Sequence, residues 1–300
     1  MGIMKFARSS TGVGLGLALG RSVPPWIGYP GGRFIADRMA GRKGSSLVRI
    51  IRANQWVIRG EKSTPDELNE AVKDVLRHQA RCFYDLYHTL TNPKAMGNLF
   101  AKSPASEKLI ELSRSGDSGA FVVAPHLSNF DLALMALAYR GMQGQVLTYG
   151  QPTGGYKIQN DIRAQTDLDI TPVSDETHQK AIQTMQTGGI VITAVDRPIQ
   201  RKAHTLNFFN RPSPMPAGHI RMALEADVPV IVVAVYTHSD TQYDIHLSEP
   251  IPMERYSDPA TEIRQNGEAV LSVIEGYIRQ APGEWLMYYP PWPEALEEMP

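Results

Sequence analysis

The chain has 300 residues, of which 42% are hydrophobic, and this is enough to form a sizeable core in one large α/β domain or two smaller ones. The single cysteine, Cys82, excludes a disulfide framework and a cysteine-based zinc site within the chain, and the formal net charge is only −1. No low-complexity segment or Pro/Ser-rich linker divides the sequence, so we interpret it as a helical N-terminal extension over residues 1–60 followed by one domain over 61–300.

The N-terminal extension is strongly basic. It contains ten lysines and arginines against one acid, Asp37, so its net charge is +9 and that of residues 61–300 is −10. Trp26, Phe34 and Trp56 lie among these cations, a pattern that favours an anionic membrane surface over nucleic acid as the partner. The alternative is a helical cap on the domain, with solvated arginines. The apolar run over residues 12–20 is too short and glycine-rich to span a bilayer, so we expect the protein to lie on a membrane rather than cross it.

A long helix is predicted next, starting at the capping sequence Thr64-Pro65-Asp66-Glu67 and ending near Leu90. Strand and helix patterns then alternate, which indicates an α/β fold with a mixed, mostly parallel central sheet flanked by helices. The predicted strands cover residues 121–125, 145–149, 169–173, 190–195, 205–209, 230–237 and 243–247. The predicted helices cover residues 129–140, 156–165, 176–186, 217–226 and 261–279.

The junction between the first of these strands and its helix carries the main candidate site. His126 follows the apolar strand, and Asp131 comes five residues later at the start of the helix. A histidine beside a carboxylate at a strand-to-helix junction is typical of a general base with an orienting partner, and this indicates proton abstraction. Helix capping by Ser128 and Asp131 is the alternative interpretation, although it leaves His126 unexplained.

Three further stretches extend this pattern along the chain. They are Val195-Asp196-Arg197 after a strand, the segment Phe208-Phe209-Asn210-Arg211-Pro212 with its continuation to Gly218, and Pro282-Gly283-Glu284-Trp285-Leu286-Met287 with Trp292. Together with the His-x4-Asp motif, they resemble the bacterial acyltransferases that include the lipid A lauroyl/myristoyl and phosphatidylinositol mannoside acyltransferases, over roughly residues 60–295. The resemblance implies a glycerolipid-acyltransferase-like fold.

The chain also departs from this family in places. Ser128-Asn129-Phe130 stands where the family often has Gly-Asn-Trp, and Asp131 stands where lipid A enzymes commonly carry Glu. The segment Tyr149-Gly150-Gln151 lacks an acidic residue that some members have. These differences leave the reaction type intact and leave the identity of the acceptor open.

The resemblance implies O-acyl transfer from acyl-CoA or acyl carrier protein, as co-substrate, to a hydroxyl of a lipid or glycolipid. In that reaction His126 would be the general base and Asp131 would orient its imidazole. Backbone N–H groups near Ser128 and Asn129, or the guanidinium of Arg163, would stabilise the oxyanion; Arg163 is alternatively a solvated helix residue. No cofactor or metal ion is expected.

Asp196 and Arg197 are candidates for binding acceptor hydroxyls or phosphate, or alternatively form a buried ion pair. The expected location is peripheral, on the cytoplasmic face of the bacterial plasma membrane. Two other functions stay open, a non-catalytic membrane-binding homologue and a thioester hydrolase.

Overall fold

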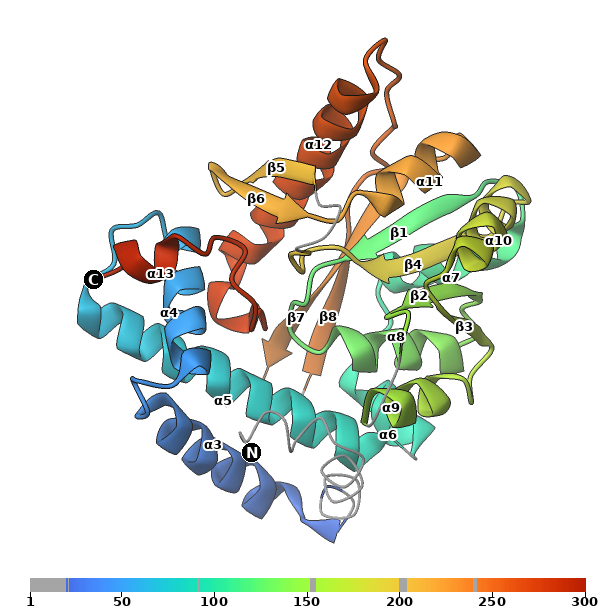
Figure 1. Cartoon of the computed structure of the whole chain (residues 1–300). Helices are drawn as coiled ribbons and strands as arrows, with labels where there is room; N and C mark the ends of the chain where they lie inside the picture. The colour runs from blue at the N-terminus through green and yellow to red at the C-terminus, as the bar shows by residue number, and fades with distance from the viewer. Residues whose placement is uncertain (1–19, 21, 91, 152–154, 200–203, 240–241) are drawn as a thin grey trace.

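The computed structural model describes residues 20, 22–90, 92–151, 155–199, 204–239 and 242–300. Three of the ten cations counted in the N-terminal extension, Lys5, Arg8 and Arg21, lie outside these ranges. Within these ranges, six strands form a central sheet in the order β3-β2-β4-β1-β7-β8 (Figure 1). The pairings are parallel except for β8, which runs antiparallel to β7. The strands are β1 (Ala120–Ala124), β2 (Gly144–Thr148), β3 (Leu168–Pro172), β4 (Ile190–Ala194), β7 (Val230–Ser239) and β8 (Gln242–Leu247). The prediction of a mixed, mostly parallel sheet is confirmed.

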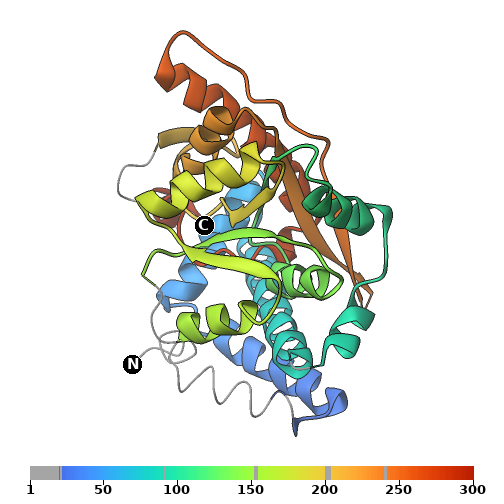
Figure 2. The same ribbon diagram turned by 90° about the vertical axis from the view of Figure 1, so that its right-hand side faces the viewer.

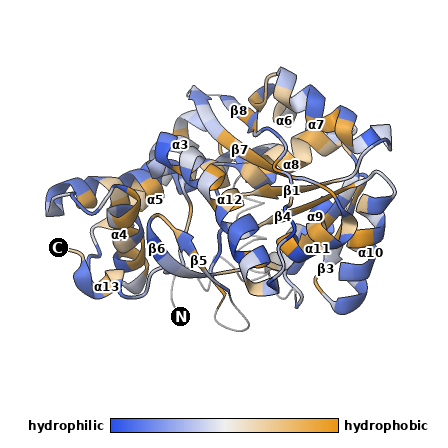
Figure 3. Ribbon diagram, turned by 90° about the horizontal axis from the view of Figure 1, so that it is seen from above, coloured by the Kyte–Doolittle hydropathy of each residue, from blue (hydrophilic) through white to orange (hydrophobic). Residues whose placement is uncertain are grey.

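The central sheet is apolar on both faces because helices cover both (Figure 3). In β1, Phe121 and Val123 pack into the cluster that contains residues of α10, α11 and α12. Val122 packs into the cluster formed with α7 and α8. The covering helices are α6 (Pro93–Leu99), α7 (Pro104–Ser115), α8 (Phe130–Tyr139), α9 (Gly155–Arg163), α10 (Asp175–Gln186), α11 (Gly218–Ala226) and α12 (Pro259–Gln280). Such two-sided burial explains why the strands read as continuous apolar runs.

The N-terminal helices α3 (Pro25–Ala40) and α4 (Ser46–Ile58) pack against α5 (Pro65–Thr89). Ala36 and Ala40 of α3 share an apolar cluster with α5, and Trp56 of α4 belongs to the large core beneath the sheet. The predicted segments 1–60 and 61–300 therefore share hydrophobic clusters in the part of the first segment that the structure describes. Figures 1 and 2 both show α3 at the lower rim of the molecule, at the opposite end from the start of α12.

The structure differs from the sequence prediction at four elements. The strand predicted over residues 205–209 is present as β5 (His204–Phe208), but it pairs with β6 (Arg211–Met215) in a separate hairpin. The strand β6 was missed because it contains two prolines, which an edge position tolerates. The helices α6 and α7 were also missed, although Asn92 and Ser103 cap them and a proline follows each cap. The chain closes with the short helices η1 (Pro282–Glu284) and α13 (Ala295–Glu298).

Candidate active site

His126 lies in the loop between β1 and α8, at the carboxyl edge of the sheet. A segment from the C-terminal part of the chain holds this loop in place. The Leu286 N–H donates to the His126 carbonyl at 2.8 Å, and the Ser128 N–H donates to the Glu284 carbonyl at 2.8 Å. Between these bonds, the buried Leu127 pairs with Trp285 in an antiparallel bridge. The backbone on both sides of the imidazole is therefore fixed by contacts distant in sequence.

Asp196 is the hydrogen-bond partner of the His126 side chain. His126 Nδ1 and Asp196 Oδ1 are 2.6 Å apart, and the His126 N–H donates to Asp196 Oδ2 at 2.8 Å. The strands β1 and β4 are parallel neighbours with Ala124 opposite Ala194, so a residue two positions beyond each strand end lies beside its counterpart. The strand register therefore brings His126 and Asp196 together.

The electrostatics of this pair favour an ionised carboxylate next to a basic imidazole. Asp196 is fully buried, and although burial opposes its charge, the charge and hydrogen bonds of His126 and the bond from Trp285 hold its pKa below the usual value. Burial also opposes a charged His126, but the charge of Asp196 and its hydrogen bond raise the pKa of His126 above 6.5. With Nδ1–H donated to the carboxylate, the neutral imidazole carries its lone pair on Nε2. The side chain of His126 is 27% exposed, so Nε2 is suited to accept a proton from a bound molecule.

Asp131 does not hold the imidazole, contrary to the role predicted for it. Its carboxylate forms a 2.5 Å ion pair with Arg163, whose guanidinium also donates to Asn160 at 2.7 Å. Asp131 lies in the first turn of α8, whereas Asp196 reaches Nδ1 from the neighbouring strand. The negative charge of Asp131 still contributes to the raised pKa of His126, after the larger contribution of Asp196.

Arg163 is buried and structurally engaged rather than a solvated helix residue. Only 8% of its side chain is exposed, and its partner Asn160 is in turn anchored to the Thr148 hydroxyl at the end of β2. The guanidinium therefore joins α9 to α8 beside the His126 loop.

Ser128 and Asn129 are both buried, and neither caps α8 through its side chain. Ser128 has a left-handed backbone with φ of 50°, and its hydroxyl lies 2.9 Å from His78 Nε2. Asn129 donates from its amide to the Cys82 carbonyl at 3.2 Å. The capping-box interpretation is thus wrong. The Ser128 N–H already donates to the Glu284 carbonyl. Of the two backbone N–H groups predicted to stabilise the oxyanion at the start of α8, that of Asn129 is therefore the better placed.

Arg197 lies next to the His126–Asp196 pair. Its guanidinium carbon is 3.7 Å from the centre of the Tyr289 ring, and its positive charge acts to lower the pKa of His126. The residue is exposed, unlike Asp196. Asp196 and Arg197, predicted as joint substrate contacts, therefore have different environments. Asp196 is committed to His126 and Trp285, and Arg197 offers a cation to solvent.

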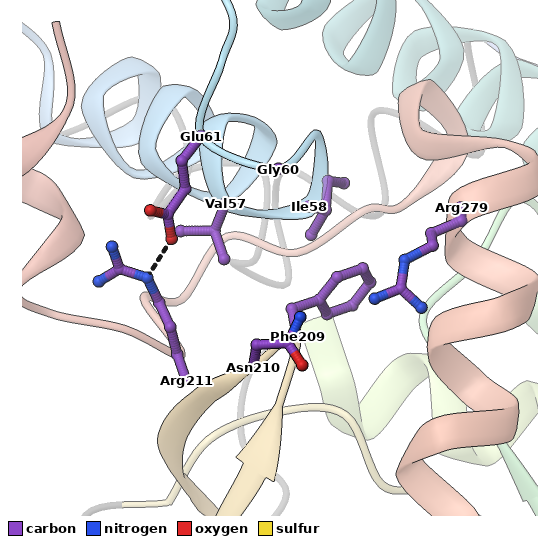
Figure 4. A pocket seen from close by; sticks show the side chains of 8 residues that line it. All are labelled: Val57, Ile58, Gly60, Glu61, Phe209, Asn210, Arg211 and Arg279. Carbon is purple, nitrogen blue, oxygen red and sulfur yellow. Dashed lines mark hydrogen bonds and ion pairs between the residues drawn. The ribbon is translucent and has the colours of Figure 1, made fainter.

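A pocket of about 500 Å³ lies apart from these residues, between α4, the β5–β6 turn and α12 (Figure 4). Across it, Glu61 and Arg211 form a 2.5 Å ion pair, and the guanidinium of Arg279 lies 4.6 Å from the centre of the Phe209 ring. Phe209 and its neighbour Phe208 are buried and belong to the hydrophobic core. None of the predicted site residues lines this pocket.

The described residues contain no group of three or more His, Cys, Asp or Glu side chains arranged to hold a metal ion. Nor does any helix in those ranges combine the length and apolar character needed to cross a bilayer.

Comparison with known families extends the similarity beyond the motifs. The family model for bacterial lipid A biosynthesis acyltransferases matches residues 12–293, which include His126, Asp131, Arg163, Asp196 and the C-terminal segment. A search of curated proteins gave no match to the chain. The match nevertheless covers nearly the whole sequence, including the N-terminal helices, where the motifs alone gave little indication. The chain therefore belongs to the bacterial lipid A biosynthesis acyltransferase family and is an enzyme that transfers acyl groups in lipid biosynthesis.

Proposed function

We propose that the protein is a membrane-associated O-acyltransferase that moves a fatty acyl chain from an acyl thioester to a hydroxyl of a lipid or glycolipid. The observation that carries this proposal is the 2.6 Å bond between His126 and the buried Asp196, at the carboxyl edge of adjacent parallel strands. A histidine held this way by a carboxylate is suited to general-base catalysis, and the family supplies the acyl-transfer chemistry.

In the proposed reaction, Nε2 of His126 removes the proton from the acceptor hydroxyl as its oxygen attacks the thioester carbonyl. A C–O bond forms, the tetrahedral intermediate collapses with cleavage of the C–S bond, and the imidazolium returns its proton to the leaving thiolate. Asp196 stabilises the imidazolium between these steps. No side-chain nucleophile is required, because the acceptor itself attacks.

Charge develops on the carbonyl oxygen during the attack, and the start of α8 is the proposed place for its stabilisation. The backbone N–H groups of Asn129 and Phe130 lie at the positive end of this helix, directly after the His126 loop. The Arg163–Asp131 ion pair supports that helix start from the side. We assign the exposed Arg197 to a phosphate of the donor or of the acceptor headgroup.

We further propose that α3 binds an anionic membrane surface on the cytoplasmic side, where acyl thioesters are available. Trp26, Ile27, Phe34 and Ile35 are between 45% and 75% exposed, which is unusual for large apolar side chains on one helix. Arg33 and Arg38 are exposed on the same helix, and Arg42 and Lys43 follow it. Aromatic anchors combined with cations are typical of an interfacial helix.

Acyl transfer by the purified protein tests the enzymatic proposal. Wild type is mixed with acyl-CoA or acyl carrier protein thioesters and with lipid extracted from a strain that lacks the gene, and the products are analysed by mass spectrometry. We expect a new acylated lipid with wild type and a loss of about a hundred- to ten-thousand-fold in rate with His126→Ala.

The same assay separates the alternatives. Thioester cleavage at an undiminished rate without acceptor would identify a hydrolase. Lipid binding by wild type without any turnover would identify a non-catalytic homologue. A His126→Ala variant that retains more than about a tenth of the wild-type rate would exclude His126 as the base.

A further inference from the structure

The C-terminal segment contributes a side chain as well as backbone bonds to the candidate site. The Trp285 indole N–H donates to Asp196 Oδ2 at 2.7 Å. The backbone N–H of His126 donates to the same oxygen at 2.8 Å, so Oδ1 is left for the imidazole. Trp285 is 1% exposed and Asp196 is fully buried, so this bond is shielded from solvent. The indole and the His126 backbone together hold Oδ2 and leave Oδ1 facing the imidazole.

An aromatic cluster fixes the indole in turn. The Trp285 ring packs against Phe208, Phe209 and Trp292, with ring centres 6.1, 6.4 and 6.2 Å away. Phe208 ends β5 and Phe209 begins the turn of the hairpin, so the cluster joins the β5–β6 hairpin to the site. The Trp292 indole donates instead to the Phe208 carbonyl at 3.1 Å. None of the hydrogen bonds that the structure gives for Asp196 comes from Trp292.

We propose that Trp285 is a positioning residue for the His126–Asp196 pair, which orients the carboxylate and stabilises its charge through the indole N–H. This inference rests on the proposed function, in which His126 is the base. Trp285 does not touch the substrate in this role and acts only through Asp196.

The loss of the indole N–H has a defined effect on His126. When the imidazole is neutral, no imidazolium offsets the charge of Asp196, and the bond from Trp285 is then worth most. Arg197 and Asp131, whose opposite charges also act on His126, are unchanged in the variants tested below. When His126 is protonated, the imidazolium itself stabilises the carboxylate. Removal of the indole N–H therefore destabilises the neutral-imidazole state more, and the pKa of His126 rises. The enzyme then needs a higher pH to present a free base.

Trp285→Phe is the test, and Trp292→Phe is its matched control. Both substitutions remove one buried indole N–H from the same aromatic cluster and leave a phenyl ring. We expect Trp285→Phe to lower kcat by about ten- to a hundredfold with KM nearly unchanged, and to move the acidic limb of the pH–rate profile to higher pH. Trp292→Phe should lower the melting temperature without moving that limb. In an Asp196→Asn background, Trp285→Phe should cost much less.

A measurement that needs no activity keeps the inference separate from the proposed function. The titration of the His126 ring is followed by NMR, with its signals assigned by their loss in His126→Gln. A higher pKa in Trp285→Phe, and not in Trp292→Phe, supports the role of Trp285 even if no acyl transfer is found. If Trp285→Phe does not fold, 3-benzothienylalanine at position 285 keeps the bicyclic shape without the donor. Equal titration curves and equal pH profiles for the two variants would overturn the inference.

Discussion

The two acidic residues near His126 have different structural roles, and the sequence analysis assigned the orientation of the imidazole to Asp131 rather than to Asp196. Asp196 is buried and bonded directly to the imidazole, whereas Asp131 is paired with Arg163 and acts on His126 only through its charge. A carboxylate that fixes the tautomer of a general base contributes far more to catalysis than one that only adds to the local potential. The two aspartates should therefore be distinguishable by the same substitution.

We predict that Asp196→Asn lowers kcat by about a thousandfold or more, because an amide at this position offers a donor to Nδ1 and favours the wrong tautomer. Asp131→Asn should cost roughly tenfold, because it weakens the ion pair with Arg163 and leaves the His126 bond intact. Steady-state kinetics on both variants, with circular dichroism as a check of folding, measure the difference. Equal losses would mean that Asp131 contacts the reacting groups more directly than its ion pair indicates.

The pH dependence of activity follows from the raised pKa of His126. A general base is active when deprotonated, so the rate should fall as the pH decreases through this pKa, with a midpoint above the ordinary value of 6.5. In Asp196→Asn the neighbouring negative charge is gone, and the midpoint of the residual activity should move to lower pH. A pH–rate profile of kcat/KM for both proteins checks the two directions. An acidic limb in the same place for both would argue against His126 as the titrating group.

Among the elements, α3 combines a buried and an exposed apolar side. Ala36 and Ala40 pack towards α5. Two polar contacts join the same helices: the Tyr29 hydroxyl donates to Asp85 at 2.6 Å, and Asp37 is paired with Arg77 of α5 at 2.6 Å. These contacts fix the helix on the body of the protein and leave Trp26 and Phe34 in solvent.

Two other cations of the N-terminal extension are less available to a membrane surface. Arg49 is paired with Glu297, and Arg52 donates to the Pro300 carbonyl.

We predict that Arg33→Glu with Arg38→Glu weakens binding to anionic vesicles and that the effect decreases as salt rises, since each cation near the surface contributes about 1 kcal/mol at most. Trp26→Ala with Phe34→Ala should weaken binding to anionic and neutral vesicles alike, independently of salt. Vesicle sedimentation measures both effects. Lys108→Glu with Arg264→Glu, exposed cations on α7 and α12, is the control. Binding that responds equally to both charge reversals would exclude α3 as the specific contact.

Besides His126, the described residues include two histidines, His219 and His78, that burial keeps neutral. Burial lowers the pKa of His219 on α11 to about 3 and that of His78 on α5 to about 4. His219 packs edge-on against Phe121 of β1, with ring centres 6.2 Å apart, and its Nε2 has no hydrogen-bond partner within the described ranges. His78 lies beside the Ser128 hydroxyl and 3.7 Å from Glu284. Both histidines link the stability of the fold to pH.

Acid should destabilise the protein well before its carboxylates titrate. The unfolded state binds a proton at each histidine below pH 6.5 while the folded state does not, so stability is lost as the pH falls from 6.5 towards 4. The slope is about 1.4 kcal/mol per pH unit for each histidine. Urea unfolding at several pH values measures this slope, and His219→Leu should reduce the slope by the contribution of one histidine. An unchanged slope in this variant would show that His219 is accessible to protons in the folded state.

Several features of the fold were accessible from local pattern. Apolar runs such as Val122–Val123 predicted strands that the sheet buries on both faces. Thr64 and Pro65 predicted the start of α5, where the structure shows a capping box between Thr64 and Glu67. His126 was recognisable because a titratable residue directly after a buried strand falls at the edge where parallel sheets build sites. The position of Asp196 relative to its strand was equally visible, since it also comes directly after a predicted strand. The signal was missed because the sequence does not say which strands are neighbours.

The sequence by itself determined most of the elements, the mostly parallel sheet, the family and the histidine at the candidate site, because each depends on residues close together in the chain. Tertiary structure decided which carboxylate reaches that histidine. His126 and Asp196 meet because β1 lies next to β4 in register, and Trp285 reaches them because a segment from the C-terminal part of the chain pairs with the His126 loop. Those pairings depend on strand order and on how the chain folds back over the sheet edge, and neither is encoded in spacing.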